Sequence, residues 1–182
     1  MKYVLLLVIA LLLLALGFIA GSTYYYYSPL HTQIKYATAV IHPTQGNEAQ
    51  GAVHFKQEKE GIRITATITG LTPGQHGFHI HEFGDCNCPD AVCAGDHFNP
   101  TNAPHGAPDS PHVHSGDLGN ITADENGNAQ YNAINKHVQL NGPHSIIGRA
   151  LIVHEKKDDL ISQPTGDSGA RLGCGVIGIS EK

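Results

Sequence analysis

Two histidines separated by one residue constrain this chain more than any other feature. In the segment Gly77–Phe83, His79 and His81 alternate with Phe78 and Ile80. Because successive side chains of a β-strand point to opposite faces, both imidazoles face one way while the apolar pair enters a core. Neutral imidazole is a good ligand for borderline metals such as zinc and copper. The pattern therefore predicts a pair of metal ligands on a rigid strand.

Further side chains that bind metals follow at intervals that can complete two adjacent sites. The set comprises His97, His105, His114, Asp117 and His154. A deprotonated imidazole binds one ion through each ring nitrogen, so a single shared histidine can join two sites. By spacing alone, His112 competes with His114 for the same role.

Strand-type patterns dominate the chain after its N-terminal leader. Between residues 62 and 69, isoleucine or alanine alternates with arginine or threonine, which is typical of a strand with one buried face. Similar short segments lie at residues 35–41, 51–57, 77–83, 117–120, 129–132, 136–140, 149–154 and 175–179. No helix-period segment of useful length follows the leader. The sequence predicts an all-β fold of roughly eight strands, closed on themselves or forming a sandwich.

Residues 84–116 show no periodicity, and a second loop, residues 155–173, leads to the last strand. A structureless segment of this length is uncommon in a compact domain unless it is functional or tied down. Both metal ligands and cysteines are available to hold residues 84–116, so we expect an ordered loop there.

The leader indicates export. Residues 3–20 are uninterrupted apolar sequence behind Lys2. A membrane span needs roughly 20 such residues, whereas a cleaved signal peptide has an apolar region of roughly 7–15. Tyr24–Tyr27 favours a membrane-interface anchor, and Ala20–Ser22 offers a cleavage site. Both a retained anchor through residues 3–20 and a cleaved signal remain open, and both place the domain on the extracytoplasmic side, either membrane-anchored or secreted.

These features divide the chain into a signal-anchor or signal peptide (1–27), a linker (28–34) and one domain (35–182). The four cysteines are disulfide candidates in an exported protein. The chain has 11 Lys and Arg against 16 Asp and Glu, a net charge of −5, without a basic stripe. This balance argues against nucleic acid as a partner.

Four motifs resemble the copper/zinc superoxide dismutase family. They are Gly77–Asp85 (GFHIHEFGD), His97–Pro100 (HFNP), Gly116–Asn120 (GDLGN) and Gly173–Ile179 (GCGVIGI). The resemblance implies an eight-stranded Greek-key β-barrel, of immunoglobulin-like sandwich architecture, with two long active-site loops. It also implies copper and zinc as cofactors and superoxide, disproportionated to dioxygen and hydrogen peroxide, as the substrate.

The resemblance assigns roles to individual residues. It implies a copper set of His79, His81, His97 and His154. It implies a zinc set of His97, His105, His114 and Asp117, in which the family interval selects His114 over His112. His97 would bridge the two ions and act in catalysis with Arg171, the family's substrate-guiding arginine. Asp158 would link His79 to His105.

The resemblance also bears on the cysteines and on assembly. Cys174 matches the family's barrel-end cysteine, with a partner among Cys86, Cys88 and Cys93. The remaining two can form a second bridge, and metal binding by the three thiols is the alternative. Three segments match the apolar homodimer contact of the family: residues 83–84, 146–148 and 178–179. A homodimer is therefore expected.

Two other classes of function fit parts of the sequence. A copper-chaperone-like or metal-buffering domain on the same barrel commonly lacks a copper ligand or the arginine, whereas all are present here. A structural β-domain that merely carries zinc would need neither His154 nor Arg171.

Overall fold

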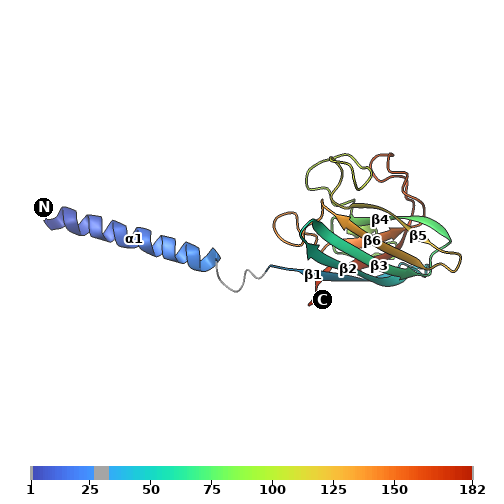
Figure 1. The fold of residues 1–182 in the computed structure, drawn as a ribbon, viewed down its shortest axis with the longest axis horizontal. Helices are drawn as coiled ribbons and strands as arrows, with labels where there is room; N and C mark the ends of the chain where they lie inside the picture. The colour runs from blue at the N-terminus through green and yellow to red at the C-terminus, as the bar shows by residue number, and fades with distance from the viewer. Residues whose placement is uncertain (1, 27–32, 182) are drawn as a thin grey trace. The chain divides into compact units, whose positions relative to one another are not determined.

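The computed structural model describes residues 2–26 and 33–181, and the chain divides into two units, Met1–Gln33 and Ile34–Lys182. The first unit contains helix α1 (Lys2–Tyr26), drawn in blue in Figure 1. Among the described residues, no helix combines the length and the apolar character required to cross a membrane. The linker expected at residues 28–34 lies outside the described residues except for its last two positions.

Within residues 33–181, the second unit contains nine strands and a short 3₁₀ helix, η2 (Val92–Ala94). The strands are β1 (Tyr36–Pro43), β2 (Gln50–Glu58), β3 (Gly61–Thr69), β4 (Gly74–His81), β5 (Asp117–Ala123), β6 (Ala129–Asn135), β7 (Ala150–His154), β8 (Arg171–Val176) and β9 (Gly178–Ile179). Because β9 has only two residues, eight longer strands carry the fold.

The strands form one closed antiparallel sheet. Their order is β2-β3-β6-β5-β4-β7-β8-β1-β9, and an additional pairing of β1 with β2 closes the barrel. The run β3-β6-β5-β4 places three consecutive strands beside the strand that precedes them, which is a Greek key. The predicted all-β barrel of eight strands is confirmed.

Alternating side chains fill the barrel. In β3, Ile62, Ile64, Ala66 and Ile68 are all buried, as the sequence pattern predicts. They join a core that includes Phe78 and Ile80 of β4 and buried residues of β1, β2, β5, β6 and β7. Burying one isoleucine or phenylalanine side chain contributes about 1.5–3 kcal/mol. The barrel is therefore a stable frame for whatever its loops carry.

The prediction of a strand at residues 136–140 is wrong, since the structure has no strand there. The side-chain oxygen of Asn135 accepts hydrogen bonds from the backbone N–H groups of His137 and Val138, at 2.8 and 3.0 Å, and turns the chain at the end of β6. Only an isolated bridge between Gln139 and Ser145 follows. Val138 and Leu140 are nevertheless buried, which explains why their alternation resembled a strand.

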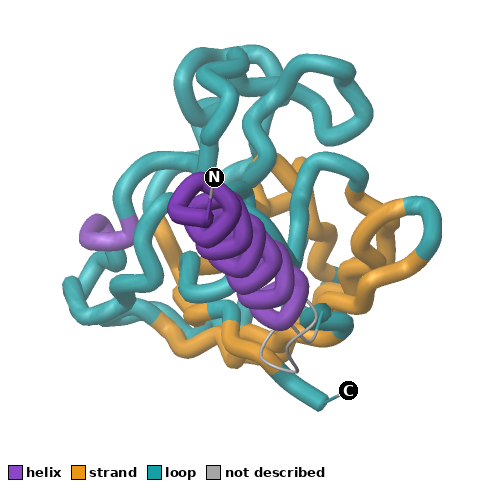
Figure 2. The backbone as a smooth tube through the Cα atoms, turned by 90° about the vertical axis from the view of Figure 1, so that its left-hand side faces the viewer, coloured by secondary structure: helices purple, strands orange, loops and turns teal. Residues whose placement is uncertain are grey.

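Two long connections stand at one end of the barrel, residues 82–116 between β4 and β5 and residues 155–170 between β7 and β8. Figures 1 and 2 show these loops gathered beside each other above the strands. Gln163 joins them, since it accepts a hydrogen bond from the His105 N–H at 2.8 Å and donates to the His105 carbonyl at 2.9 Å. The segment without periodicity is thus an ordered loop.

Candidate metal centre

The centre is built outward from β4, which lies between β5 and β7 in the sheet. His79 and His81 alternate on this strand and are 0% and 1% exposed. The strand register places His79 opposite Asp117 of β5, and an isolated bridge pairs His81 with His97. The barrel thereby brings together residues from two strands and a loop that lie far apart in the sequence.

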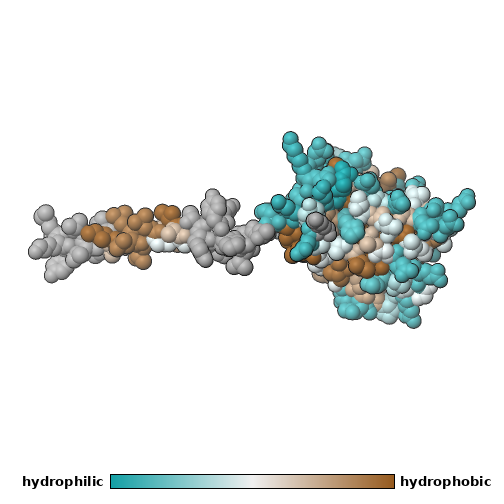
Figure 3. Space-filling model, turned by 60° about the horizontal axis from the view of Figure 1, so that its bottom comes forward, coloured by the Kyte–Doolittle hydropathy of each residue, from teal (hydrophilic) through white to brown (hydrophobic). Residues whose placement is uncertain are grey.

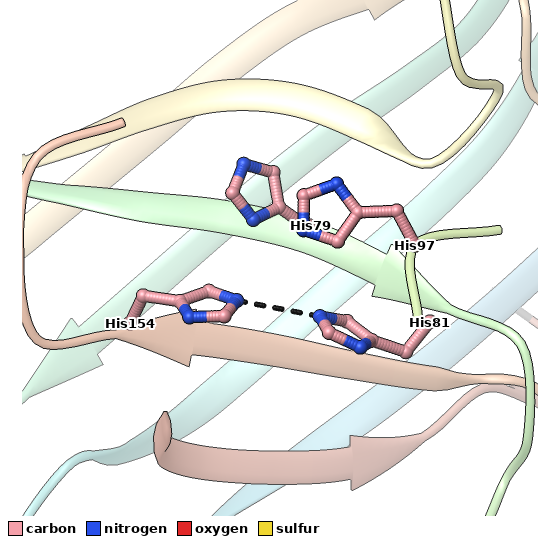
Figure 4. A group of neighbouring side chains, drawn as sticks. All are labelled: His79, His81, His97 and His154. Atoms are coloured by element: carbon pink, nitrogen blue, oxygen red, sulfur yellow. Dashed lines mark hydrogen bonds between the residues drawn. The ribbon is translucent and has the colours of Figure 1, made fainter. Parts of the chain in front are cut away.

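The first group of ligand-type side chains contains four histidines whose ligand atoms lie within 4.8 Å of one another: His79, His81, His97 and His154. All four are buried. Figure 4 shows their rings turned toward a common point, with His154 at the end of β7 and His97 on the loop after β4. The ring centroids of His79 and His97 are 4.1 Å apart.

Backbone carbonyls set the orientation of two of these rings. Nδ1 of His81 donates to the Gly95 carbonyl at 2.9 Å, and Nδ1 of His154 donates to the Gly169 carbonyl at 3.3 Å. Because a carbonyl oxygen only accepts, each Nδ1 carries the proton and each Nε2 keeps its lone pair. The two Nε2 atoms lie 3.3 Å apart (Figure 4), as expected for two ligands of one ion.

The second group shares His97 with the first and consists of His97, His105, His114 and Asp117. The Nδ1 atoms of the three histidines lie 2.7, 2.9 and 3.3 Å from the Asp117 carboxylate oxygens, in that order. Nδ1 of His105 and Nδ1 of His114 nevertheless form no hydrogen bond. The ligand atoms of the group lie within 4.8 Å of one another, as expected for side chains that hold one ion.

Asp158 connects the two groups. This carboxylate is 0% exposed and accepts hydrogen bonds from Nε2 of His79 at 2.8 Å and from Nε2 of His105 at 2.9 Å. Both rings therefore carry the proton on Nε2 and present Nδ1 as the ligand atom. Asn120 holds Asp158 in place by two side-chain-to-backbone hydrogen bonds of 2.7 and 2.9 Å.

Gly166 makes room for this carboxylate. A Cβ added at this position would collide with Oδ1 of Asp158 and lie 2.6 Å from Nε2 of His105. The residue also has a φ of +68°, in the left-handed region that favours glycine. The loop after β7 can close over Asp158 only because residue 166 lacks a side chain.

Burial keeps most of the imidazoles neutral. It lowers the pKa of His79 to about 4 and lowers the pKa values of His81, His97 and His154 as well. For His105, burial alone would lower the pKa, but the nearby carboxylates of Asp117 and Asp158 outweigh it and raise the pKa to about 9. A metal ion that binds His105 must therefore displace a proton.

The residues of both groups fit metal ions. Four buried ring nitrogens of the described residues have no hydrogen-bond partner: Nδ1 of His79, Nε2 of His97, Nδ1 of His105 and Nδ1 of His114. Leaving such an atom unsatisfied costs about 1–3 kcal/mol, which an ion at each group would offset. Four imidazoles suit the tetragonal nitrogen coordination of Cu(II). Three imidazoles and one carboxylate form the closed four-ligand set of a structural zinc.

Arg171 lies beside the first group. It begins β8 and pairs with His154 of β7 in the strand register. Its guanidinium donates to the Ala91 carbonyl at 2.6 Å and to the Gly95 carbonyl at 2.7 Å. Gly95 O also accepts the hydrogen bond of His81. Among residues 33–181 no carboxylate forms an ion pair with Arg171, so its charge is available to an anion.

The cysteines of the described chain are all paired. Cys86 is bonded to Cys174, so the partner of Cys174 that the sequence left open is Cys86 in this structure. This bridge ties the loop after β4 to β8. Cys88 is bonded to Cys93 within the same loop.

Several residues of the site carry no signal in the sequence. Asn120 and Gln163 act through side-chain-to-backbone hydrogen bonds that only the loop geometry reveals. His76 is 1% exposed, and its Nδ1 lies 2.8 Å from the His154 carbonyl, so it helps to place that ligand. His112 is exposed and belongs to neither group.

An antiparallel barrel whose loops hold two histidine-rich groups joined by one imidazole defines a class of protein with a binuclear metal centre. A family model described as copper/zinc superoxide dismutase (SODC) matches residues 49–177. The extracellular superoxide dismutase (Cu-Zn) of Brugia pahangi is 46% identical over 158 residues, which cover 82% of this chain and 78% of that protein. The crystal structure of the clock protein EA4 is 40% identical with a TM-score of 0.75, covering 82% of this chain and 97% of that chain.

The chain belongs to the copper/zinc superoxide dismutase family. It is accordingly an oxidoreductase that acts on superoxide, and its cofactors are copper and zinc.

Proposed function

We propose that the two groups divide the metals as their donor sets suggest. The four-histidine group, His79, His81, His97 and His154, holds copper. The group that contains the carboxylate, His97, His105, His114 and Asp117, holds zinc. The observation that carries this proposal is the position of His97, whose Nδ1 faces Asp117 while its buried Nε2 has no hydrogen-bond partner. One ring thus offers a nitrogen to each group.

The division of labour follows from the two metals. Copper, when bound, supplies the one-electron redox couple that disproportionation of superoxide requires and that zinc lacks. The chain supplies binding and protons. Arg171 attracts the superoxide anion to the copper side, because its guanidinium lies beside His81 and has no ion-pair partner among the described residues. A local positive charge of this kind can steer an anion even though the chain carries a net charge of −5.

His97 is the residue that can deliver a proton. Its Nδ1 is held at 2.7 Å from Oδ1 of Asp117, and the residue is only 2% exposed. Nε2 is therefore the ring atom that takes up and releases a proton within the site, shielded from bulk water. Hydrogen peroxide requires two protons, of which Nε2 of His97 supplies one and water the other.

Replacing His154 tests the assignment. In His154→Ala the copper group loses one of its four ligands, while the zinc group and Asp158 are untouched. We expect superoxide dismutation to fall to background. Copper binding should be weaker, and zinc should remain bound at one ion per chain. His112→Ala, which changes an exposed histidine outside both groups, is the matched control and keeps full activity. Activity that survives in His154→Ala would refute the assignment of copper to this group.

We propose that the chain is exported. Residues 1–27 act as the leader, residues 28–34 as a linker and residues 35–182 as the enzyme domain. The leader is apolar behind Lys2, and the relative from Brugia pahangi is named an extracellular enzyme. N-terminal sequencing of the mature protein distinguishes a removed leader, which means secretion, from a retained one, which means a membrane anchor. Recovery of the protein in the cytosol would contradict export.

We propose that the domain forms a homodimer through an apolar patch of Phe83, Val176 and Ile179, which are 57%, 44% and 65% exposed. Gly84 and Gly148 connect the patch, since a Cβ added to Gly84 would collide with the Gly148 carbonyl. Hydrophobic residues (brown) also gather between hydrophilic ones (teal) on the face shown in Figure 3. Exposed apolar patches rimmed by polar residues mark contact surfaces.

Light scattering tests the dimer. Phe83→Lys should halve the molar mass of the particle in solution. Ile161→Lys, which alters a residue that is 77% exposed and lies outside the patch, should leave the mass unchanged. A monomer in the unsubstituted protein would refute the proposal.

A further inference from the structure

The position of Arg171 depends on one short turn, residues 88–95, in the loop after β4. Both hydrogen bonds that its guanidinium makes end on carbonyl oxygens of this turn, Ala91 at 2.6 Å and Gly95 at 2.7 Å. No carboxylate of residues 33–181 pairs with the guanidinium to hold it elsewhere. A displacement of the turn therefore displaces the charge that faces the copper side.

The turn has an unfavourable backbone conformation at the residue that matters most. Ala91 has φ 56° and ψ 19°, the left-handed region, although it is not a glycine. This conformation costs roughly 1–2 kcal/mol for a residue with a Cβ, and such residues persist only where surrounding contacts over-determine them. Ala91 is 0% exposed, and its N–H donates to the Cys88 carbonyl at 2.9 Å.

The Cys88–Cys93 disulfide encloses Ala91. The two cysteines are five positions apart with Cα atoms separated by 5.6 Å, and Ala91 lies between them. The other bridge, Cys86–Cys174, ties the base of the loop to β8. Ala91 packs in a small cluster with Ala94, Ala150, Ile152 and Cys174, against which Cys86 packs, whereas Cys88 and Cys93 are only partly buried and lie outside it. The second bridge therefore shapes the turn without filling the core.

We propose that the Cys88–Cys93 disulfide is a positioning element for catalysis: by closing the turn that carries the Ala91 carbonyl, it holds the Arg171 guanidinium at the copper side. The inference rests on the proposed role of Arg171 in attracting superoxide. Cys88 and Cys93 do not touch the substrate and act only through the arginine. The bridge contributes to the rate with superoxide and not to metal binding. It closes residues 88–93, which include no metal-binding side chain, and the Gly95 carbonyl that orients His81 lies outside this span.

The first test is whether the bridge exists in solution. Peptide mapping of the exported chain without reduction should recover Cys88 linked to Cys93 and Cys86 linked to Cys174. Free thiols at residues 88 and 93, or a different pairing, would overturn the inference.

The second test removes the bridge from the copper- and zinc-loaded full chain by the double substitution Cys88→Ser and Cys93→Ser. We expect the rate constant with superoxide to fall by about threefold to tenfold, since small displacements of a positioning group cost up to about 100-fold. Metal content should not change. Modification of Arg171 by phenylglyoxal, followed by mass spectrometry, should become at least about threefold faster as the guanidinium loses its carbonyl partners. The matched control is Val92→Ser, which changes a 59% exposed side chain within the intact turn and should alter neither rate.

A double-mutant cycle separates positioning from general stabilisation. In an Arg171→Ala background, removing the bridge should cause no further loss of activity, because the residue through which it acts is absent. An equal loss with and without Arg171, or an unchanged modification rate in the double serine variant, would refute the inference. If Arg171→Ala itself leaves the rate with superoxide unchanged, the proposed role of the arginine has failed instead.

Discussion

Asp158 gives the sharpest prediction, because one buried carboxylate fixes a ligand of each metal. Its two oxygens accept hydrogen bonds from Nε2 of His79 and Nε2 of His105, at 2.8 and 2.9 Å. Asp158→Asn conserves the shape but offers one acceptor oxygen and one donor NH₂ group. The amide oxygen can accept a hydrogen bond from only one ring. The Nε2–H of the other ring then faces the amide NH₂ group, and two donors cannot pair. That ring must move its proton to Nδ1, which removes its ligand lone pair.

The expected magnitude follows from the loss of one such partner. Removing a group that orients a metal-bound histidine typically lowers metal affinity by 10–100-fold, which corresponds to about 1.4–2.7 kcal/mol. Because Asp158 contacts one histidine of each group, the substitution should weaken the binding of copper, of zinc or of both. The outcome depends on which ring donates its hydrogen bond to the amide oxygen. Neutralising the 0% exposed carboxylate also removes one of the two carboxylates, Asp117 and Asp158, that raise the pKa of His105 to about 9.

Chelator competition measures the effect. Titration of the metal-loaded protein with chelators of graded affinity should show the 10–100-fold loss of metal affinity in Asp158→Asn. Asp159→Asn is the matched control, because the neighbouring carboxylate is exposed and contacts no histidine. Unchanged affinities for both metals in Asp158→Asn would refute the idea that hydrogen bonding to this carboxylate selects the ligand nitrogens.

Three further predictions concern the protonation, covalent and steric features of the site. After treatment with a chelator, the free energy of unfolding should peak near neutral pH. Burial lowers the pKa of His79 from 6.5 to about 4, so stability of about 3 kcal/mol that is present above pH 6.5 is lost as the pH falls to 4. The nearby carboxylates raise the pKa of His105 to about 9, so its contribution is present below pH 6.5 and is lost as the pH rises through 9. Urea unfolding across this range checks the profile, and a flat profile would contradict it. Replacing Cys86 and Cys174 by serine should lower the free energy of unfolding by about 2–5 kcal/mol, and equal stability by the same assay would refute a structural role. Gly166→Ala should weaken metal binding in chelator competition, because its Cβ would collide with the buried carboxylate, and wild-type affinity would show that the loop can yield.

Local patterns predict part of this structure well. Alternation in β3 and β4 depends only on neighbouring residues, so the buried faces and the pair His79 and His81 are readable from the sequence. The same reasoning failed at residues 136–140. There, the side-chain oxygen of Asn135 accepts hydrogen bonds from backbone N–H groups that would pair with a neighbouring strand if the segment were a strand.

Other parts of the site have no local signature. The carbonyls of Ala91 and Gly95 hold Arg171, and every residue type has a carbonyl. Asn120 meets Asp158 across a loop closure of 38 residues, which spacing cannot reveal. The two long loops have no repeating backbone hydrogen bonds to predict. Metal-binding side chains and disulfides lie in the loop of residues 82–116, and Gln163 joins the loop of residues 155–170 to it.

The central claim is that the ring of His97 joins a copper ion to a zinc ion. A crystal structure of the loaded protein, with anomalous scattering recorded at the absorption edges of both metals, tests it directly. We predict copper at Nε2 and zinc at Nδ1 of His97, each about 2.1 Å from its nitrogen. Two ions too far apart for one imidazole to contact both, or a single ion in the whole centre, would contradict the account.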